Sequence, residues 1–430
     1  MKSIWNENIK KVQFDPLQGD IRTDVLIIGG GMCGILCAYM LKEAGVDCVL
    51  AEADKICQGI TNGTTAKVTV QHGLIYDKII KKYGIDTAYR YFESQKKAFE
   101  KIKELAKGAD CDFEMCDSFV YSKGDRQLIE NEVKALNTVG LKAQFCESTE
   151  LPFKVAGAVK VENQAQFHPL KFAYKISEDL KIYDDTKILE LKPGEAITNR
   201  GKISAKKIIV ATHFPFINKH GGYFIKMYQH RSYVLALRNA QKITGMYVDE
   251  AKDGLSFRMC GDLLLLGGGS HRTGAKGGNW EELSEVAKKY YPDVQEVARW
   301  ATQDCMTLDS IPYIGNYSKS TPDLYVATGF NKWGMTSSMV SAMILSDMVQ
   351  GRKNPYTSVY SPSRSIFHPQ LAVNMFESVK GLLTPTVPRC PHLGCALKYN
   401  KQEHSWDCPC HGSRFEESGK LINNPATDDK

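Results

Sequence analysis

The alternation of apolar and polar residues divides the chain into the elements of an α/β protein. An apolar run rich in β-branched residues, 25–28, predicts a strand buried on both faces. A glycine-rich turn follows it, then a helical apolar pattern that ends at Gly45, then a second strand over 47–51. Similar patterns predict a helical stretch over 76–107, strands over 205–212, 223–237, 256–267 and 324–327, and a helix over 335–348.

Composition excludes several classes of protein. The 430 residues are 43% hydrophobic, yet no apolar run approaches the roughly 18 residues of a membrane span. Charged and polar residues occupy the N-terminus where an export signal would carry its apolar core, so we expect a cytoplasmic protein. The net charge of +6 is spread along the chain, which indicates a solvated surface and no nucleic-acid partner. The cysteines before residue 390 show no paired spacing and are expected to be reduced thiols.

Three glycines after the first strand, Gly29, Gly31 and Gly34, form the pattern GxGxxG at the start of the helix. In this pattern one glycine allows a tight turn, one lets the backbone approach a pyrophosphate, and one lets the helix pack on the strand. The helix N-terminus offers free N–H groups to phosphate. Glu52, at the end of the second strand, can accept hydrogen bonds from a ribose. An ordinary glycine turn is the alternative, but this order of elements favours dinucleotide binding.

A polar loop, 59–67, follows Glu52 and ends in Thr65, Ala66 and Lys67. A simple NAD domain would not need such a loop, and its glycines and threonines suit a segment that wraps a larger cofactor.

Three separated blocks of sequence carry a family resemblance. The first is the glycine motif with Glu52 and the loop 59–67, the second is AKKIIVAT at 205–212, and the third is TLDSIPYIGN at 307–316 followed by LYVATGFNKWGMTSSM. Together they resemble the D-amino-acid oxidase (DAO) superfamily of FAD-dependent oxidoreductases, over about residues 20–352. The resemblance implies an enzyme whose FAD contacts come from these blocks, at Gly29, Gly31, Gly34, Glu52, Thr65, Ala66, Lys67, Ala211, Thr212, Gly315, Gly329, Phe330, Gly334, Met335 and Thr336.

The same resemblance implies that an inserted domain binds a small-molecule substrate over the flavin. Members of the family oxidise the C–N bond of amines or amino acids, so we expect a substrate of that class. Arg231 is our candidate for a contact with a carboxylate or another anion, because a guanidinium can bind it through two parallel hydrogen bonds. His72 and Tyr233 are further candidates for the catalytic site. A salt-bridged Arg231 and a structural, hydrogen-bonded His72 are the alternatives.

The last 41 residues carry a dense group of metal-ligand residue types. Cys390 and His392 form C-x-H, and Cys408 and His411 form C-x-x-H. Two thiolates and two imidazoles can bind zinc, or can divide between the two irons of a [2Fe–2S] cluster, and the spacing favours the cluster. A decayed, empty site is the third possibility.

The two loops, CPHLGC and CPCHGS, resemble those of a Rieske domain at every hallmark position. The resemblance implies that Cys390 and Cys408 bind one iron and that His392 and His411 bind the other. It also implies a disulfide between Cys395 and Cys410 and, at Ser413, a hydroxyl that donates to a cluster sulfur. The module is shorter than a typical Rieske domain and has little core of its own, so it must depend on the flavoprotein or on the cluster for order.

We therefore predict an α/β (α+β overall) fold: a Rossmann-like FAD/NAD(P)-binding domain with an inserted α+β substrate domain and a small C-terminal β-rich Rieske iron–sulfur module. The chain would oxidise its substrate at FAD and exchange single electrons through the cluster with a redox partner protein or a small carrier. An O2-using flavin oxidase with a structural tail and an electron-transfer adaptor without a substrate are the alternatives. The predicted ranges are 20–75, 155–215 and 305–352 for FAD binding, 76–154 and 216–304 for the substrate domain, 353–384 for a linker with a short helix, and 385–430 for the Rieske module.

Overall fold

The apolar run at 25–28 lies within β1 (Ile21–Ile28), in the middle of a largely parallel sheet. The computed structural model that shows this describes residues 3–7, 9–385 and 388–430. β1 pairs in parallel with β2 (Cys48–Ala51) on one side and with β10 (Lys202–Val210) on the other. The four residues 25–28 are all buried, because helices and neighbouring chain cover both faces of the sheet.

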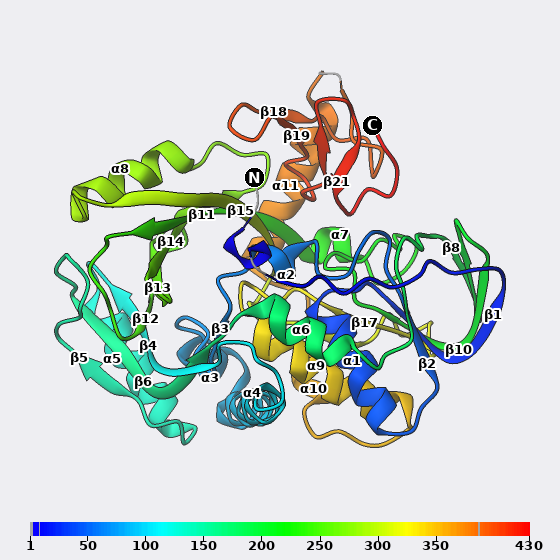
Figure 1. Ribbon diagram of the computed structural model, residues 1–430, viewed down its shortest axis with the longest axis horizontal. Coiled ribbons are helices and arrows are strands. Elements are labelled where there is room, and N and C mark those ends of the chain that lie inside the picture. Colours follow the sequence, from blue (N-terminus) through cyan, green and yellow to red (C-terminus); the bar gives the residue numbers. More distant parts are fainter. Residues whose placement is uncertain (1–2, 8, 386–387) are drawn as a thin grey trace.

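Eight strands make up this first sheet, shown on the right of Figure 1. Beyond β10 lie β17 and the antiparallel edge strand β16, and beyond β2 lies β7, while β9 pairs with both β10 and β8. The bounds of these strands are β7 (Ile182–Tyr183), β8 (Ile188–Lys192), β9 (Glu195–Thr198), β16 (Tyr313–Asn316) and β17 (Leu324–Thr328). Helices α1 (Met32–Glu43) and α9 (Gly334–Val349) pack against each other and against the sheet, α9 matching the predicted helix at 335–348.

A second sheet of nine strands forms the other large layer, on the left of Figure 1. Its order is β15-β11-β14-β13-β12-β4-β6-β3, with β5 paired to β6. The bounds are β3 (Lys67–Val68), β4 (Glu114–Ser122), β5 (Gln144–Cys146), β6 (Gly157–Gln166), β11 (Met227–Arg238), β12 (Met246–Asp249), β13 (Ser256–Cys260), β14 (Leu263–Arg272) and β15 (Gln295–Thr307).

Several predicted boundaries need correction. The helical stretch 76–107 is two helices, α3 (Tyr76–Tyr83) and α4 (Ile85–Ala106), because Gly84 between them has φ +85°. The segment 223–237 opens with a helical turn, α7 (Tyr223–Lys226), before β11 begins. The strand predicted at 256–267 is the hairpin of β13 and β14.

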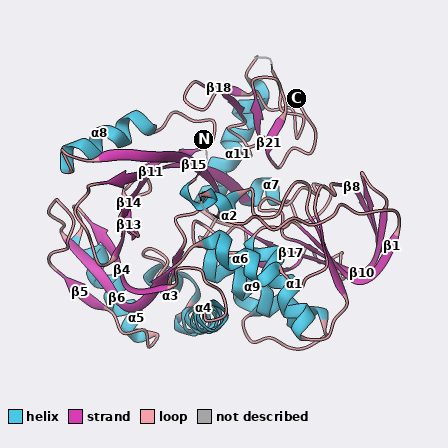
Figure 2. Cartoon of the chain, viewed as in Figure 1, coloured by secondary structure: helices cyan, strands magenta, loops and turns pink. Residues whose placement is uncertain are grey.

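One predicted domain boundary also differs from the structure. β6 lies inside the range 155–215, which we assigned to FAD binding, but it pairs antiparallel with β4 in the nine-stranded sheet. The remaining helices are η1 (Ile4–Asn6), α2 (Ile60–Gly63), α5 (Arg126–Thr138), α6 (Pro169–Ser177), α8 (Trp280–Tyr290) and α10 (Thr357–Tyr360). Helices α4, α6 and α9 lie between the two large sheets (Figure 2).

The C-terminal part of the chain forms a small third layer at the top of Figure 1. Helix α11 (Pro369–Leu383) leads into a four-stranded antiparallel sheet of β18 (Lys398–Asn400), β19 (Ser405–Asp407), β20 (Arg414–Glu416) and β21 (Leu421–Asn423). Residues 386–387 of the predicted range 385–430 lie outside the described residues. Among the residues that the structure describes, no helix combines the length and apolarity needed to cross a membrane.

Candidate functional site

A cavity of about 930 Å³ lies where the first sheet, the second sheet and the C-terminal module meet. Its walls include the ends of β1 and β10 at Gly29 and Ala211, residues of β11 and β15, and the segment that follows β21. The volume is in the range of cofactor and ligand sites.

The glycine loop gives this cavity the shape of a phosphate cradle. A Cβ on Gly34 would lie 1.9 Å from the carbonyl oxygen of Gly29, so only glycine lets α1 pack this closely on β1. Gly29 has φ +108°, and a Cβ there would lie 2.7 Å from the carbonyl oxygen of Ala211. Gly31 faces the cavity, with Thr61 Oγ1 3.5 Å from its ideal Cβ position, and begins α1 without a side-chain cap. The N–H of Met32 donates to Thr61 Oγ1 at 3.0 Å, and the next N–H groups of the first turn can bind a pyrophosphate.

Glu52, which directly follows β2, is hydrogen-bonded to the glycine loop. Its Oε2 accepts a hydrogen bond from the N–H of Gly30 at 2.6 Å, and its Oε1 accepts one from the N–H of Asp54 at 3.0 Å. Burial raises the pKa of the Glu52 carboxyl, while these two donors act in the opposite direction. The carboxylate lines the cavity, where it can accept hydrogen bonds from a ribose.

The predicted FAD residues divide into a wall and its support. Ten of them line the cavity: Gly29, Gly31, Glu52, Thr65, Lys67, Ala211, Thr212, Phe330, Gly334 and Met335. The other five are not part of the wall: Gly34, Ala66, Gly315, Gly329 and Thr336. These five allow close packing or hold the wall in place, as when Thr336 Oγ1 donates to the carbonyl of Thr69 at 3.1 Å. The assignment of each residue to FAD stays a prediction.

Lys67 brings a positive charge to the cavity wall. Burial, with help from the nearby Arg258, lowers the pKa of its amine to about 7, and its Nζ donates to Thr65 Oγ1 at 3.2 Å.

We expect this low pKa to make FAD binding dependent on pH. An anionic dinucleotide stabilises the ammonium form, so the pKa of Lys67 should be higher in the complex than in the apoprotein. FAD affinity should therefore be highest below pH 7 and should fall as the pH rises above 7. Titration of apoprotein with FAD from pH 6 to 9 measures this, and Lys67→Met should bind more weakly with a flat profile. If the FAD affinity of Lys67→Met fell with rising pH at the same slope, the pH dependence would belong to another group.

Both ring nitrogens of His72 have hydrogen-bond partners. Its Nδ1 lies 2.7 Å from Tyr91 Oη, and its Nε2 lies 2.8 Å from the Thr69 carbonyl and 3.1 Å from Thr336 Oγ1. The ring stacks on Trp333, and burial lowers its pKa to about 3. Both nitrogens are thus engaged, which matches the structural alternative for this histidine and gives its catalytic prediction no support.

Arg231 has a partner that the sequence did not indicate. Its Nε donates to Glu403 Oε1 at 2.7 Å, and its Nη2 pairs with Glu403 Oε2, so the guanidinium is already bound to a carboxylate of the C-terminal module. Tyr233 Oη, at 3.4 Å, donates to the same carboxylate. Two of the three guanidinium nitrogens of Arg231 are therefore bound to Glu403, which matches the salt-bridged alternative, and both the contact of Arg231 with a substrate anion and the role of Tyr233 in catalysis stay predictions.

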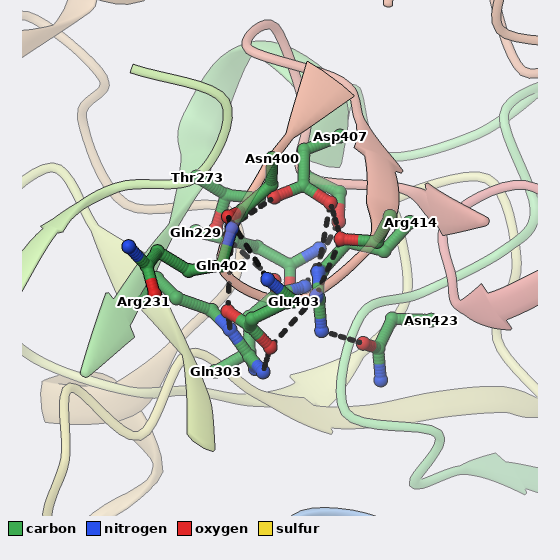
Figure 3. Close-up of polar contacts among 12 residues, drawn as sticks. Gln229, Arg231, Thr273, Gln303, Asn400, Gln402, Glu403, Asp407, Arg414 and Asn423 are labelled. Atoms are coloured by element: carbon green, nitrogen blue, oxygen red, sulfur yellow. Dashed lines mark hydrogen bonds and ion pairs between the residues drawn. The ribbon is translucent and has the colours of Figure 1, made fainter. Parts of the chain in front are cut away.

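Glu403 is the centre of a buried ion network, shown in Figure 3. Arg414 Nη2 reaches Glu403 Oε2 at 2.8 Å, and Arg414 Nε reaches Asp407 Oδ1 at 2.9 Å. Burial of Glu403 would raise its pKa, but the two arginines outweigh it and hold the pKa at about 2. The network joins β11 of the second sheet to the β18–β19 turn and β20 of the C-terminal module.

The predicted cluster ligands meet in the C-terminal module. Of these ligands, Cys390 and Cys408 are both buried in the core of the module, and the Sγ of Cys408 lies within 4.8 Å of those of Cys395 and Cys410, the predicted disulfide pair. The rings of His392 and His411 face each other edge to face, with centroids 4.9 Å apart.

The imidazole nitrogens show that these residues fit a metal cluster. The Nδ1 atoms of His392 and His411, and Nε2 of His411, are buried without a hydrogen-bond partner in the described structure. The Nε2 of His392 has a partner, Asn218 Oδ1, at 2.8 Å. A buried imidazole nitrogen with no partner is costly, and iron ligation through Nδ1 would satisfy that nitrogen in both histidines.

Cys395 and Cys410 are close but unbonded thiols in this structure. Their disulfide therefore stays a prediction. Ser413 Oγ accepts a hydrogen bond from the N–H of Ala426 at 3.0 Å. The donation of this hydroxyl to a cluster sulfur stays a prediction.

Side chains of the second sheet hold the backbone of the second cluster loop. Gln229 Nε2 donates to the carbonyl of His411, and Gln303 Nε2 donates to the carbonyl of Gly412, both at 2.9 Å. Arg272 donates to the carbonyls of Pro409 and Cys410 at 3.0 and 2.9 Å. Figure 3 shows Gln229 and Gln303 beside the ion network. The cluster loop is therefore fixed to β11, β14 and β15.

Sequence reasoning missed these interface residues. Gln229 and Gln303 are fully buried in the structure, but β11 and β15 carry several other polar residues, so no sequence signal marked these two. It also missed Lys332 and Asp304, which line the cavity, and Asn424, which follows the last strand.

The comparisons with known proteins agree with this architecture. The family model described as FAD dependent oxidoreductase (DAO) matches residues 24–348, and the model of the Rieske [2Fe-2S] domain matches residues 362–429. The chain belongs to the DAO family of FAD-dependent oxidoreductases and carries a C-terminal Rieske domain. It is an oxidoreductase whose cofactors are FAD and a [2Fe–2S] cluster. The Rieske match begins within the segment that we assigned to a linker, so it includes α11.

Individual relatives share one or both parts. The chain is 35% identical to the YhfW protein of Bacillus subtilis (strain 168), named as a Rieske 2Fe-2S iron-sulfur protein, over 99% of this chain and 96% of that one. It is 26% identical to the gamma-glutamylputrescine oxidoreductase of Escherichia coli (strain K12), over 80% of this chain and 87% of that one. The crystal structure of L-proline dehydrogenase from P. horikoshii superposes with a TM-score of 0.67 at 18% identity, covering 81% and 98% of the two chains. This last likeness concerns the fold.

Proposed function

We propose that the chain oxidises the C–N bond of an amine or amino acid at FAD and passes the electrons, one at a time, through the Rieske cluster. The observation that carries this proposal is the direct attachment of the cluster loop to the cavity. Gln229 holds the carbonyl of the ligand His411, while its neighbours on β11, Tyr228 and His230, line the cavity. The names of the relatives supply the substrate class.

FAD, when bound, supplies the acceptor for a hydride, and the cluster carries single electrons. The protein's own residues place the reactants. The roof of the cavity includes Tyr228, His230, Lys332 and Asp304, and Lys332 Nζ donates to Ser270 Oγ at 2.6 Å. These groups offer both signs of charge to a zwitterionic or cationic substrate.

The electron balance requires an external partner. Oxidation of a C–N bond removes two electrons, while the cluster holds one, so each turnover needs two transfers to a one-electron acceptor. We propose a redox partner protein or a small carrier for this role, and no nucleic acid. We also propose a cytoplasmic location, which the unpaired spacing of the cysteines before residue 390 supports.

An anaerobic experiment tests the proposal. Addition of amines and amino acids should bleach the flavin and then give the rhombic EPR signal of a reduced Rieske centre. Cys408→Ser should retain the bleaching and lose the EPR signal, because it removes an iron ligand. Protein that holds zinc or no iron would contradict the proposal. In a separate assay in air, rapid peroxide production that is unchanged in Cys408→Ser would instead favour a flavin oxidase with a structural tail.

A further inference from the structure

The C-terminal segment 423–427 forms part of the wall of the FAD cavity. Asn423, Asn424, Ala426 and Thr427 line the same cavity as the glycine loop and Glu52, although nearly 400 residues separate them in sequence. The segment follows β21, the last strand of the Rieske module. The cavity is therefore built by both modules.

Hydrogen bonds fasten this segment to the dinucleotide-binding sheet. Asn424 Nδ2 donates to the carbonyls of Thr212 and Phe214, both at 2.7 Å. Thr212 lies just beyond the end of β10 and lines the cavity. Lys187 Nζ donates to the carbonyl of Thr427, and the preceding residue, Thr186, donates its N–H to the carbonyl of Glu52. Because Glu52 is the ribose-binding candidate, the segment lies at the adenosine end of the cavity.

The same segment is tied to the cluster loop. The N–H of Ala426 donates to Ser413 Oγ, and the carbonyl of Ser413 accepts from the N–H of Cys408 at 2.8 Å. Gln229 Nε2 donates both to the carbonyl of His411 and, at 3.0 Å, to the carbonyl of Asn424. One side chain thus holds a ligand-bearing loop and a wall of the cavity together.

We propose that segment 423–427 is part of the FAD-binding site, and that FAD binding and cluster loading stabilise each other. The module is small, with a core of seven buried apolar residues centred on its four clustered cysteines, so the cluster contributes to its order. An ordered cluster loop positions Ser413 and the carbonyl of His411, and these position the cavity wall. By thermodynamic linkage, if the bound cluster raises the affinity of the protein for FAD by some factor, bound FAD must raise the affinity for the cluster by the same factor.

The first test measures FAD affinity in a variant of the segment. Asn424→Ala removes two donors to the backbone beside the cavity, and we expect its dissociation constant for FAD to rise about tenfold. Titration of the apoflavoprotein with FAD, followed by fluorescence, gives this constant. Iron content and the visible spectrum of the cluster should remain those of the wild type. Ser418→Ala, an exposed position in the same module, is the matched control and should bind FAD as the wild type does.

The second test needs no substitution. Wild-type protein with a full cluster should bind FAD more tightly than iron-depleted protein, and FAD should slow the loss of iron to a chelator by the corresponding factor. Equal FAD affinity in both forms, or wild-type affinity in Asn424→Ala, would overturn the proposal. Neither readout depends on a substrate or on electron transfer, so these results are separate from those that test the proposed function.

Discussion

Replacement of Glu403 by alanine is expected to release the Rieske module from the flavoprotein. The side chains of Arg231, Glu403 and Arg414 are 7%, 8% and 4% exposed, so the substitution would leave two guanidinium groups buried without their shared partner. Loss of one member of a buried ion network costs about 3–5 kcal/mol, most of it the penalty for the uncompensated charge. Urea unfolding followed by the visible circular dichroism of the cluster should show this loss.

Glu417→Ala is the matched control for this prediction. Glu417 pairs with His404 in the same module, but their side chains are 57% and 74% exposed, and such surface pairs contribute less than about 1 kcal/mol. A loss in Glu403→Ala no greater than in this control would contradict the prediction.

The ion network also predicts how docking responds to acid. The pKa of Glu403 is about 2 in the folded protein, below its ordinary value of 4.5. A lowered carboxyl pKa contributes stability that is fully present above pH 4.5 and is lost as the pH falls from 4.5 toward 2. The wild type should show this loss, and Glu403→Ala should lack it.

Gly34→Ala is expected to abolish FAD binding. The added Cβ would lie 1.9 Å from the carbonyl oxygen of Gly29, which is backbone and cannot rotate away. Helix α1 must then move off β1, and the N–H groups at its start lose their position beside the pyrophosphate. We expect FAD affinity to fall at least 100-fold and stability to fall by about 2–4 kcal/mol. FAD content after purification and thermal unfolding measure the two effects.

Gly124→Ala controls for the loss of a glycine as such. Nothing lies within 4 Å of its ideal Cβ position, and Gly124 is not part of the cavity wall. It should retain FAD and wild-type stability. Purification of Gly34→Ala with one FAD per chain would show that the loop tolerates the side chain and that our account of its packing is wrong.

The local pattern of residues was sufficient for the strand–turn–helix at the start of the chain. β1, Gly29, Gly31 and α1 follow one another directly, so their geometry depends on backbone rules and apolar periodicity alone. The cluster loops could also be recognised from the sequence, because each loop places its cysteine and histidine within a few residues of each other. The same holds for the family resemblance, which the matching family models confirm.

The contact partners of individual side chains could not be predicted from the local sequence. Arg231 and Glu403 are 172 residues apart, and nothing near either residue indicates the other. For His72, the sequence gave no sign that both ring nitrogens have partners, one of them 264 residues away.

The sequence by itself thus determined the class of this protein and its two cofactors, because the motifs that bind them are short and continuous. Only the tertiary structure decided that the modules share one cavity wall and one ion network. Side-chain periodicity sets which face of a strand is buried, but the packing of sheets from distant parts of the chain sets what that face meets. For Asn424, that partner is the backbone of Thr212.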